Sequence, residues 1–141
     1  MSKKGPIILV DDDGDDQEIM IRVLEELKVP NKLLIFNDCG AALLYLRKTD
    51  EQPFLIICDI NIPGQNGIEF KTEIDEDPQL RDKSVPFIFF STSASQPVVD
   101  IAYKKLTVQG FFKKPENFPE VKRLINRVVE YWSDCKHPNS F

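Results

Sequence analysis

Polar side chains that can bind a cation or a phosphate stand at the ends of short apolar runs in this sequence. In chain order they are Asp11, Asp12, Asp59, Ser91 and Lys114. Carboxylates brought together without a neutralising partner repel one another and raise at least one pKa, so the aspartates favour a bound cation. Oxygen ligands of this kind suit Mg²⁺, which also takes phosphate oxygens. Because a hydroxyl and an ammonium can contact the oxygens of a transferring phosphoryl group, the pattern predicts Mg²⁺-dependent phosphoryl chemistry.

The apolar runs have the pattern of buried β-strands. They cover residues 7–10, 33–36, 54–58, 87–90 and 110–112. Most are continuous rather than alternating, as in parallel strands that helices cover on both faces. The carboxyl ends of parallel strands share one edge of the sheet, and ligands bind there at the point where the strand order reverses. We therefore expect the polar residues at the strand ends to meet at one site.

Stretches with helical spacing of apolar residues follow the predicted strands. The expected helices cover residues 15–27, 41–48, 67–74, 97–105 and 118–132. Strands that are each followed by a helix, with right-handed crossovers, form a doubly wound α/β fold. We expect a five-stranded parallel sheet of the flavodoxin-like order 2-1-3-4-5, with helices on both faces. That order puts the reversal between the first and third strands, next to the aspartates.

Composition restricts the classes of partner and the compartment. The 141 residues match one domain, which we expect to span residues 1–141 with a core over about 5–133 and a short C-terminal tail. The 23 acidic residues outnumber the 18 basic ones, which argues against a nucleic-acid partner. No apolar stretch approaches the roughly 18 residues that indicate a membrane span. The three cysteines lie outside any CxxC pair, so we expect a reducing, cytoplasmic environment.

Simpler interpretations exist for each residue taken alone. The aspartates over 11–16 could only start a helix by complementing its dipole. Ser91 could be an ordinary strand-end hydroxyl, and Lys114 could be a solvated lysine. The coincidence of several strand ends nevertheless favours a common site. His137, the only histidine, is expected to be an exposed bystander, which leaves no histidine-based dyad.

Four segments resemble those of a known family in both order and spacing. They are ILVDDD at the first strand, ICDINIPGQNG after the third, PFIFFSTSAS at the fourth and GFFKKP at the fifth. Together they resemble the CheY-like receiver domains of response regulators in two-component signalling. The resemblance implies a signalling protein rather than an enzyme, with Mg²⁺-dependent self-phosphorylation and autodephosphorylation.

The resemblance assigns roles to the acidic residues and to the loop after the third strand. It implies that Asp59 is the phosphoacceptor and that Asp12 and Asp59 bind the metal directly. It also implies that Asp11 holds a metal-bound water. The backbone carbonyl of Asn61 is a further expected metal ligand.

The resemblance further implies a switch built from the fourth and fifth strands. Ser91 is expected to bind a phosphoryl oxygen, and Lys114 is expected to pair with the phosphoryl group. Phe111 would occupy the aromatic position that turns inward when Ser91 moves toward the phosphoryl group. A cis Lys114–Pro115 bond is also implied, which an X-Pro bond permits.

Expected partners follow from the same resemblance. Residues 74–105 resemble a subgroup of single-domain regulators that are associated with bacterial phytochrome kinases. We expect a histidine kinase of this phytochrome type as phosphodonor, and a phosphotransfer protein or downstream effector as the next partner. In similar receivers the output surface corresponds to residues 97–105, 110–113 and 118–132, through which a homodimer would form.

Two other protein classes share part of the aspartate pattern. A haloacid-dehalogenase-type phosphatase would use Asp11 and Asp13 and would also form an aspartyl phosphate with Mg²⁺. It leaves Asp59 unexplained, however, and it requires a later acidic pair that is missing beyond the fifth predicted strand. An EF-hand calcium loop starting at Asp11 would have Asp16 instead of glycine at its sixth position and Arg22 instead of glutamate at its twelfth.

Overall fold

The strands form one parallel sheet in the computed structural model, which describes residues 2–138. The five strands in this range are β1 (Ile7–Val10), β2 (Leu33–Phe36), β3 (Leu55–Cys58), β4 (Phe87–Ser91) and β5 (Gly110–Lys113). Their order is β2-β1-β3-β4-β5, and each neighbouring pair is parallel. The predicted fold class is therefore confirmed. Three strands differ from the prediction by one residue at one end, because the hydrogen-bonded ladder rather than the apolar run sets a strand's limits.

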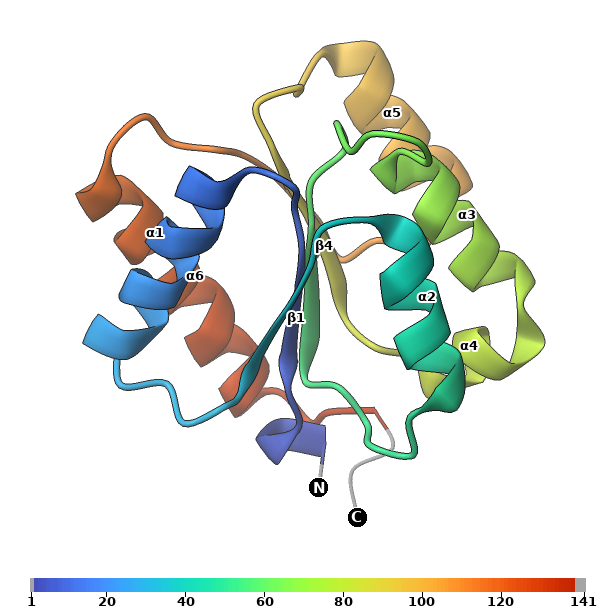
Figure 1. Cartoon of the computed structure of the whole chain (residues 1–141), viewed down its shortest axis with the longest axis horizontal. Helices are drawn as coiled ribbons and strands as arrows, with labels where there is room; N and C mark the ends of the chain where they lie inside the picture. The colour runs from blue at the N-terminus through green and yellow to red at the C-terminus, as the bar shows by residue number, and fades with distance from the viewer. Residues whose placement is uncertain (1, 139–141) are drawn as a thin grey trace.

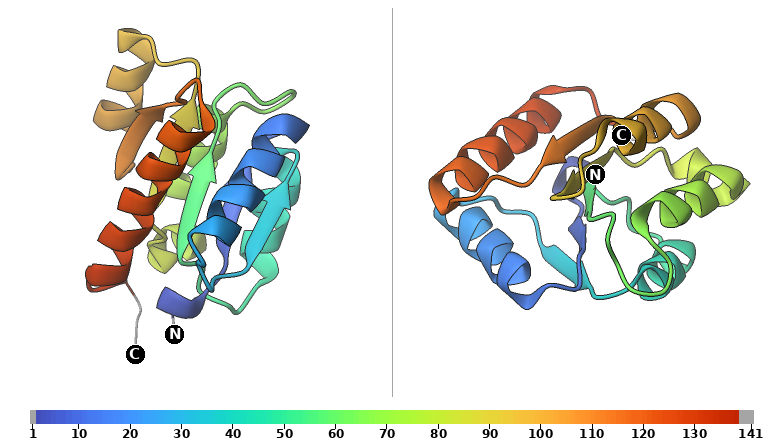
Figure 2. Two further views of the ribbon diagram at one scale, coloured as in Figure 1. Left: turned by 90° about the vertical axis from the view of Figure 1, so that its left-hand side faces the viewer. Right: turned by 90° about the horizontal axis from the view of Figure 1, so that it is seen from above.

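Helices cover both faces of this sheet. They are α1 (Gly14–Glu26), α2 (Cys39–Lys48), α3 (Gly67–Glu76), α4 (Pro78–Lys83), α5 (Gln96–Lys105) and α6 (Phe118–Asp134), and a 3₁₀ turn, η1 (Ser2–Lys4), precedes β1. Figure 1 shows α1 and α6 on one face and the other four helices on the opposite face. The view from above in Figure 2 looks down on the strands between these two layers. None of the helices described is long and apolar enough to cross a membrane.

The two faces of the sheet bury separate apolar cores. Ile7 and Leu9 of β1 pack into the core under α1 and α6, whereas Ile8 and Val10 pack into the core under α2, α3 and α5. Because successive side chains of a strand point to opposite faces, a strand covered on both sides must be apolar at every position. This geometry explains the continuous apolar run of β1.

Within residues 2–138, α4 is the α-helix that apolar spacing does not predict. It has six residues and one buried side chain, Leu80, which is too little for a periodic pattern. The start of α4 nevertheless has residues that are typical of a helix N-terminus. The Asp77 carboxylate accepts hydrogen bonds from the amides of Gln79 and Leu80, and Pro78 occupies the first turn.

The chain after α6 differs from the prediction of an exposed histidine. His137 is only 3% exposed. Its Nε2 atom lies 2.6 Å from the carbonyl oxygen of Phe54, and its ring stacks on the Phe54 ring with 5.5 Å between centroids. The prediction is wrong because the carbonyl satisfies the ring nitrogen while the aromatic neighbours, including Trp132, cover the ring.

Candidate functional site

The predicted site residues meet at the carboxyl edge of the sheet. Asp11 and Asp59 directly follow β1 and β3, Ser91 ends β4 and Lys114 directly follows β5. Backbone hydrogen bonds extend the ladders past the strands. The Asp59 amide donates to the Val10 carbonyl at 2.9 Å, and the Lys114 amide donates to the Ser91 carbonyl at 3.0 Å. These bonds fix the backbone positions of Asp59 and Lys114 relative to the neighbouring strands. Side chains of residues far apart in the sequence therefore face one another.

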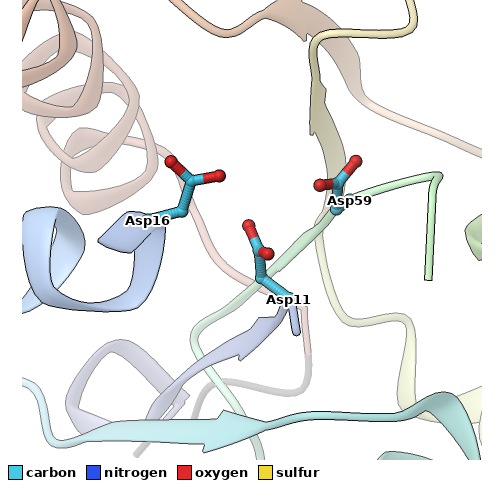
Figure 3. A group of neighbouring side chains, drawn as sticks. All are labelled: Asp11, Asp16 and Asp59. Atoms are coloured by element: carbon cyan, nitrogen blue, oxygen red, sulfur yellow. The ribbon is translucent and has the colours of Figure 1, made fainter. Parts of the chain in front are cut away.

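The ammonium of Lys114 lies at the centre of the site. Its Nζ atom donates to carboxylate oxygens of Asp11, Asp16 and Asp59 at 2.8, 2.7 and 2.8 Å. Since an ammonium has three N–H donors, each donor has an acceptor. The Lys114 side chain is 8% exposed, so its charge is buried among these partners. Figure 3 shows the three carboxylates converging from the ends of β1 and β3 and from the first turn of α1.

The peptide bond that follows Lys114 does not have the expected isomer. In the part of the chain that the structure describes, no peptide bond is cis, and the Lys114–Pro115 bond is trans. The prediction of a cis bond is therefore wrong. The trans form is the lower-energy isomer even before proline.

Burial and ion pairing act in opposite directions on the charges of the site. Burial disfavours the ammonium of Lys114, but the hydrogen bonds to the three carboxylates outweigh burial and raise the pKa of this lysine. Burial raises the pKa of Asp11, although the hydrogen bonds from Lys114 and the Asp13 amide oppose this effect. One ammonium does not balance three carboxylates, so the site retains the capacity to attract a further cation.

Asp16 belongs to the site, although the spacing of strand ends does not predict it. It lies in the first turn of α1, and its side chain is 34% exposed. Helical spacing could have placed Asp16 toward the sheet, because it shares a helical face with Met20 and Val23, which are buried against the sheet. Asp12, in contrast, is exposed and lies outside the group of three carboxylates. Its role as a metal ligand stays a prediction.

The loop between β3 and α3 holds the Asp59 carboxylate in place. Its Oδ1 atom accepts from the amide of Ile60 at 2.6 Å and from the amide of Asn61 at 3.3 Å, while Oδ2 contacts Lys114. The loop closes tightly at Gly67, where a Cβ atom would lie 2.3 Å from the backbone oxygen of Asp59. Glycine is therefore required at this position.

The loops after β3 and β4 are joined above the site. The side-chain amide of Asn61 donates a hydrogen bond to the hydroxyl of Ser93. The Ser91 hydroxyl in turn accepts from the Ser93 amide at 3.1 Å, and Ser91 is fully buried. Coordination of a metal by the Asn61 carbonyl stays a prediction.

Phe111, the predicted switch aromatic, lies beside the site on β5. Its side chain is half-buried and packs against Phe89 of β4, with 5.6 Å between ring centroids. Phe89 lies two residues before Ser91 on the same strand, so both side chains point to the same face of the sheet. Ser91 therefore lies on the same face of the sheet as the Phe89–Phe111 contact, and the role of Phe111 in a switch stays a prediction.

The three carboxylates fit a divalent cation in donor type and spacing. One oxygen atom from each of Asp11, Asp16 and Asp59 lies within 4.8 Å of the others. Carboxylate oxygens are the ligands that Mg²⁺ and Mn²⁺ prefer. One oxygen of each of these carboxylates accepts a hydrogen bond from Lys114, so a cation would compete with the ammonium for the carboxylates.

A doubly wound sheet with buried carboxylates and a lysine at its carboxyl edge defines a class of phosphoryl-accepting signalling domains, and comparison with known proteins agrees. The family model of the response regulator receiver domain matches residues 7–126. The chain is 28% identical over 131 residues to the response regulator Rcp1 of Synechocystis sp., covering 89% of this chain and 87% of the relative.

Solved structures of similar proteins have the same fold. The phosphorylated cyanobacterial phytochrome response regulator RcpA is 27% identical with a TM-score of 0.85, covering 97% of this chain and 99% of that chain. The Mn²⁺-bound form of Rcp1 is 25% identical with a TM-score of 0.82, again covering 97% and 99%.

This chain belongs to the response regulator receiver domain family. The alternative of a haloacid-dehalogenase-type phosphatase using Asp11 and Asp13 is not supported. The Asp13 carboxylate caps α1 by accepting from the amides of Asp15 and Asp16 at 2.8 and 3.2 Å. The EF-hand alternative is also wrong, because the chain is helical from Gly14 onward instead of forming a calcium loop.

Proposed function

We propose that this protein is a phosphorylation-dependent switch in which Asp59 accepts a phosphoryl group from a histidine kinase. The observation that carries the proposal is the buried contact of 2.8 Å between the Lys114 ammonium and the Asp59 carboxylate. An ammonium at this position neutralises charge on the phosphoryl oxygens as they approach the carboxylate. The side chain of Asp59 is 10% exposed, so it is not completely closed off from solvent.

The transfer itself requires few protein groups. A carboxylate oxygen of Asp59 forms a bond to phosphorus, and the bond between phosphorus and the histidine nitrogen of the kinase breaks. The electron pair of that bond stays on the imidazole, and the product on this chain is an acyl phosphate. Hydrolysis by water then restores the carboxylate and releases phosphate. Lys114 and the Ser91 hydroxyl would contact the phosphoryl oxygens throughout.

A Mg²⁺ ion would neutralise charge between the carboxylates and the phosphoryl group. Asp59 would hold it directly, with Asp12 and the backbone carbonyl of Asn61 as further ligands and Asp11 binding a metal-bound water. The similar protein Rcp1 has been solved in an Mn²⁺-bound form, which supports a divalent ion as a ligand of this chain.

The proposed phosphodonor is a histidine kinase of the phytochrome type. Support comes from the similarity to RcpA, described as a phosphorylated cyanobacterial phytochrome response regulator. The chain would act as a single receiver domain over residues 1–141, which passes the signal to a phosphotransfer protein or to a downstream effector.

The proposed output surface comprises α5, β5 and α6. An apolar groove of about 440 Å³ on this surface is lined by Phe112 of β5 and by Leu124 and Trp132 of α6. Tyr103 of α5 and Tyr131 of α6 are 52% and 62% exposed. Phosphorylation would shift the balance between two conformations of Ser91 and Phe111 and so change how a second copy or a partner binds.

Intact-mass spectrometry tests the phosphorylation. With Mg²⁺ and acetyl phosphate, we expect the wild-type protein to gain one phosphoryl group and the Asp59→Asn variant to gain none. Asp15→Asn is the matched control, because Asp15 is exposed and belongs to the same acidic segment. Labelling of Asp59→Asn at the wild-type rate would contradict the proposal.

A further inference from the structure

A second cavity lies at the amino-terminal edge of the sheet, opposite the Asp59 site. It has a volume of about 300 Å³ and is lined mainly by α3, α4, the start of β4 and the segment that precedes β5. Phe87, which lines it, is the first residue of β4, whereas Ser91 is the last residue of that strand. A cavity of this size is at the lower limit of small-molecule sites.

A buried lysine, Lys71 of α3, lines this cavity. Its side chain is 5% exposed, and its Nζ atom lies 5.0 Å from the centroid of the Phe87 ring. Burial lowers the pKa of Lys71, and the ion pair with Asp75 opposes this effect. Among residues 2–138, Asp75 is the one described hydrogen-bond acceptor, at 2.9 Å. Two of the three N–H donors of the ammonium are thus left for another acceptor.

The Asp75 carboxylate has hydrogen-bond partners besides Lys71. It accepts from the backbone amide of Thr107 at 3.0 Å and from the Thr107 hydroxyl at 2.6 Å, besides its contact with Lys71. Burial disfavours the charged carboxylate, but these hydrogen bonds outweigh burial and lower the pKa of Asp75. The contacts between Asp75 and Thr107 therefore link α3 to the segment before β5. The ion pair with Asp75 keeps the Lys71 ammonium at the cavity wall.

Other lining groups are cations and hydrogen-bond donors. Arg81 at the end of α4 has no carboxylate partner in the described part of the chain. The side chains of Lys71 and Arg81 line the cavity together with the carboxylate of Asp75, in a chain whose formal net charge is −5. This local excess of positive charge favours an anionic ligand.

The remaining wall is apolar. Ile74, Leu80, Val85 and Phe87 line it, so the cavity combines a cationic end with a surface that excludes water. Gln109 fixes the adjoining wall, because its side-chain oxygen accepts from the Phe87 amide at 2.6 Å. Within residues 2–138 its side-chain NH₂ group has no protein acceptor, so this donor can contact a ligand. A ligand that fits both ends carries a negative group on an apolar body.

We propose that this cavity binds a small organic anion whose carboxylate contacts Lys71 and Arg81 and whose apolar body packs on Phe87. Such a ligand would give the receiver a second input that is separate from Asp59. Binding of this ligand does not require phosphorylation of Asp59. A failure of the proposed switch would therefore leave this proposal untouched, and the reverse also holds.

The experiment is a titration of the full chain with benzoate, followed by ¹H–¹⁵N NMR. Benzamide, which has the same shape without the charge, is the matched probe. We expect benzoate to cause saturable shifts at the amides of Lys71, Phe87 and Thr107, in the wild type and in Asp59→Asn. Benzamide should bind at least about tenfold more weakly, the loss expected for hydrogen bonds to charged groups.

Two variants locate the anion. Lys71→Met keeps an unbranched apolar side chain, removes the ammonium, and should weaken benzoate binding by about tenfold or more. Arg81→Gln changes an exposed residue, cannot disturb the core, and should weaken binding about threefold, as expected for a partly solvated charge. Arg127→Gln is the control, because Arg127 lines the separate groove between β5 and α6. It should leave benzoate binding unchanged.

Three results would overturn the proposal. One is the absence of saturable shifts at millimolar benzoate. A second is equal binding of benzamide and benzoate. The third is a set of shifts centred on the Asp59 edge or on the Arg127 groove, with Arg81→Gln binding as the wild type does. If Lys71→Met does not fold, the direct titration and Arg81→Gln still decide the question.

Discussion

The Nζ atom of Lys114 lies 2.7 Å from a carboxylate oxygen of Asp16, although the two residues are 98 positions apart in the chain. This contact gives Lys114 an acceptor outside the pair of carboxylates that directly follow β1 and β3. If a cation binds the Asp59 carboxylate, as we propose, the ammonium can keep its contact with Asp16. Lys114 would then remain at the site to meet the phosphoryl group.

The first prediction concerns this contact. Asp16→Asn should slow phosphorylation by acetyl phosphate about two- to fivefold, which corresponds to roughly 0.5–1 kcal/mol for a partly exposed ion pair. The initial rate of labelling by intact-mass spectrometry measures the effect. Asp15→Asn removes the same charge from the neighbouring exposed position and should label as the wild type does. Equal slowing in both variants would mean that only the general charge of the segment matters.

The second prediction tests the proposed direct metal ligands. Asp12→Ala should remove most of the weak Mg²⁺ binding of the unphosphorylated protein, since Asp12 is proposed as one of two direct carboxylate ligands. Titration calorimetry measures the affinity. If Asp12→Ala binds Mg²⁺ as tightly as the wild type and Asp16→Asn does not, Asp16 is the ligand instead. The group of carboxylates at Asp11, Asp16 and Asp59 makes this outcome a specific alternative.

The third prediction concerns the switch. Beryllofluoride with Mg²⁺ should change chemical shifts across α5, β5 and α6 and strengthen self-association or partner binding. Ser91→Ala should blunt both effects, because it removes the hydroxyl that would contact the phosphoryl mimic. NMR spectra and sedimentation velocity provide the two readouts. Shifts confined to the surroundings of Asp59, with unchanged association, would instead favour a role as a phosphate relay.

The fourth prediction addresses the buried histidine. His137→Ala should lower the free energy of unfolding by about 1–3 kcal/mol, through loss of the hydrogen bond to Phe54 and of the ring stacking. Urea denaturation measures the change. Lys136→Ala, at the exposed neighbouring position, is the control and should have no comparable effect. Phosphorylation of His137→Ala should proceed at the wild-type rate under conditions in which the protein is folded, because His137 lies at the opposite edge of the sheet from Asp59.

The fifth prediction is a pH dependence that involves Asp75. The folded state lowers the pKa of this carboxyl below its ordinary value of 3.8. Its ionised form therefore contributes stability above the ordinary pKa, and this contribution is lost as the pH falls through the folded-state pKa. Asp75→Asn should be less stable than the wild type at neutral pH, and the difference should shrink below about pH 4.

Urea denaturation at a series of pH values measures this difference. Glu76→Gln, which changes an exposed neighbour, serves as the control and should show no such trend. A gap between Asp75→Asn and the wild type that is constant down to pH 2 would show that the ionised form of Asp75 is not what stabilises the fold.

Much of this protein follows from local sequence patterns. Continuous apolar runs require cover on both faces, so strands such as Ile7–Val10 predict a parallel sheet between helices. A residue that directly follows such a strand lies at the carboxyl edge whatever the rest of the chain does. For this reason the positions of Asp11, Asp59, Ser91 and Lys114 at one edge were predictable.

Other features depend on contacts between distant segments, and only the tertiary structure decided them. Asp16 is at the site and Asp12 is exposed because the packing of α1 on the sheet selects which aspartate of the acidic segment faces Lys114. His137 is buried because the chain beyond α6 meets the segment that precedes β3, 83 positions earlier. Periodicity describes the faces of one element, but the partner of each face is set by how the elements pack.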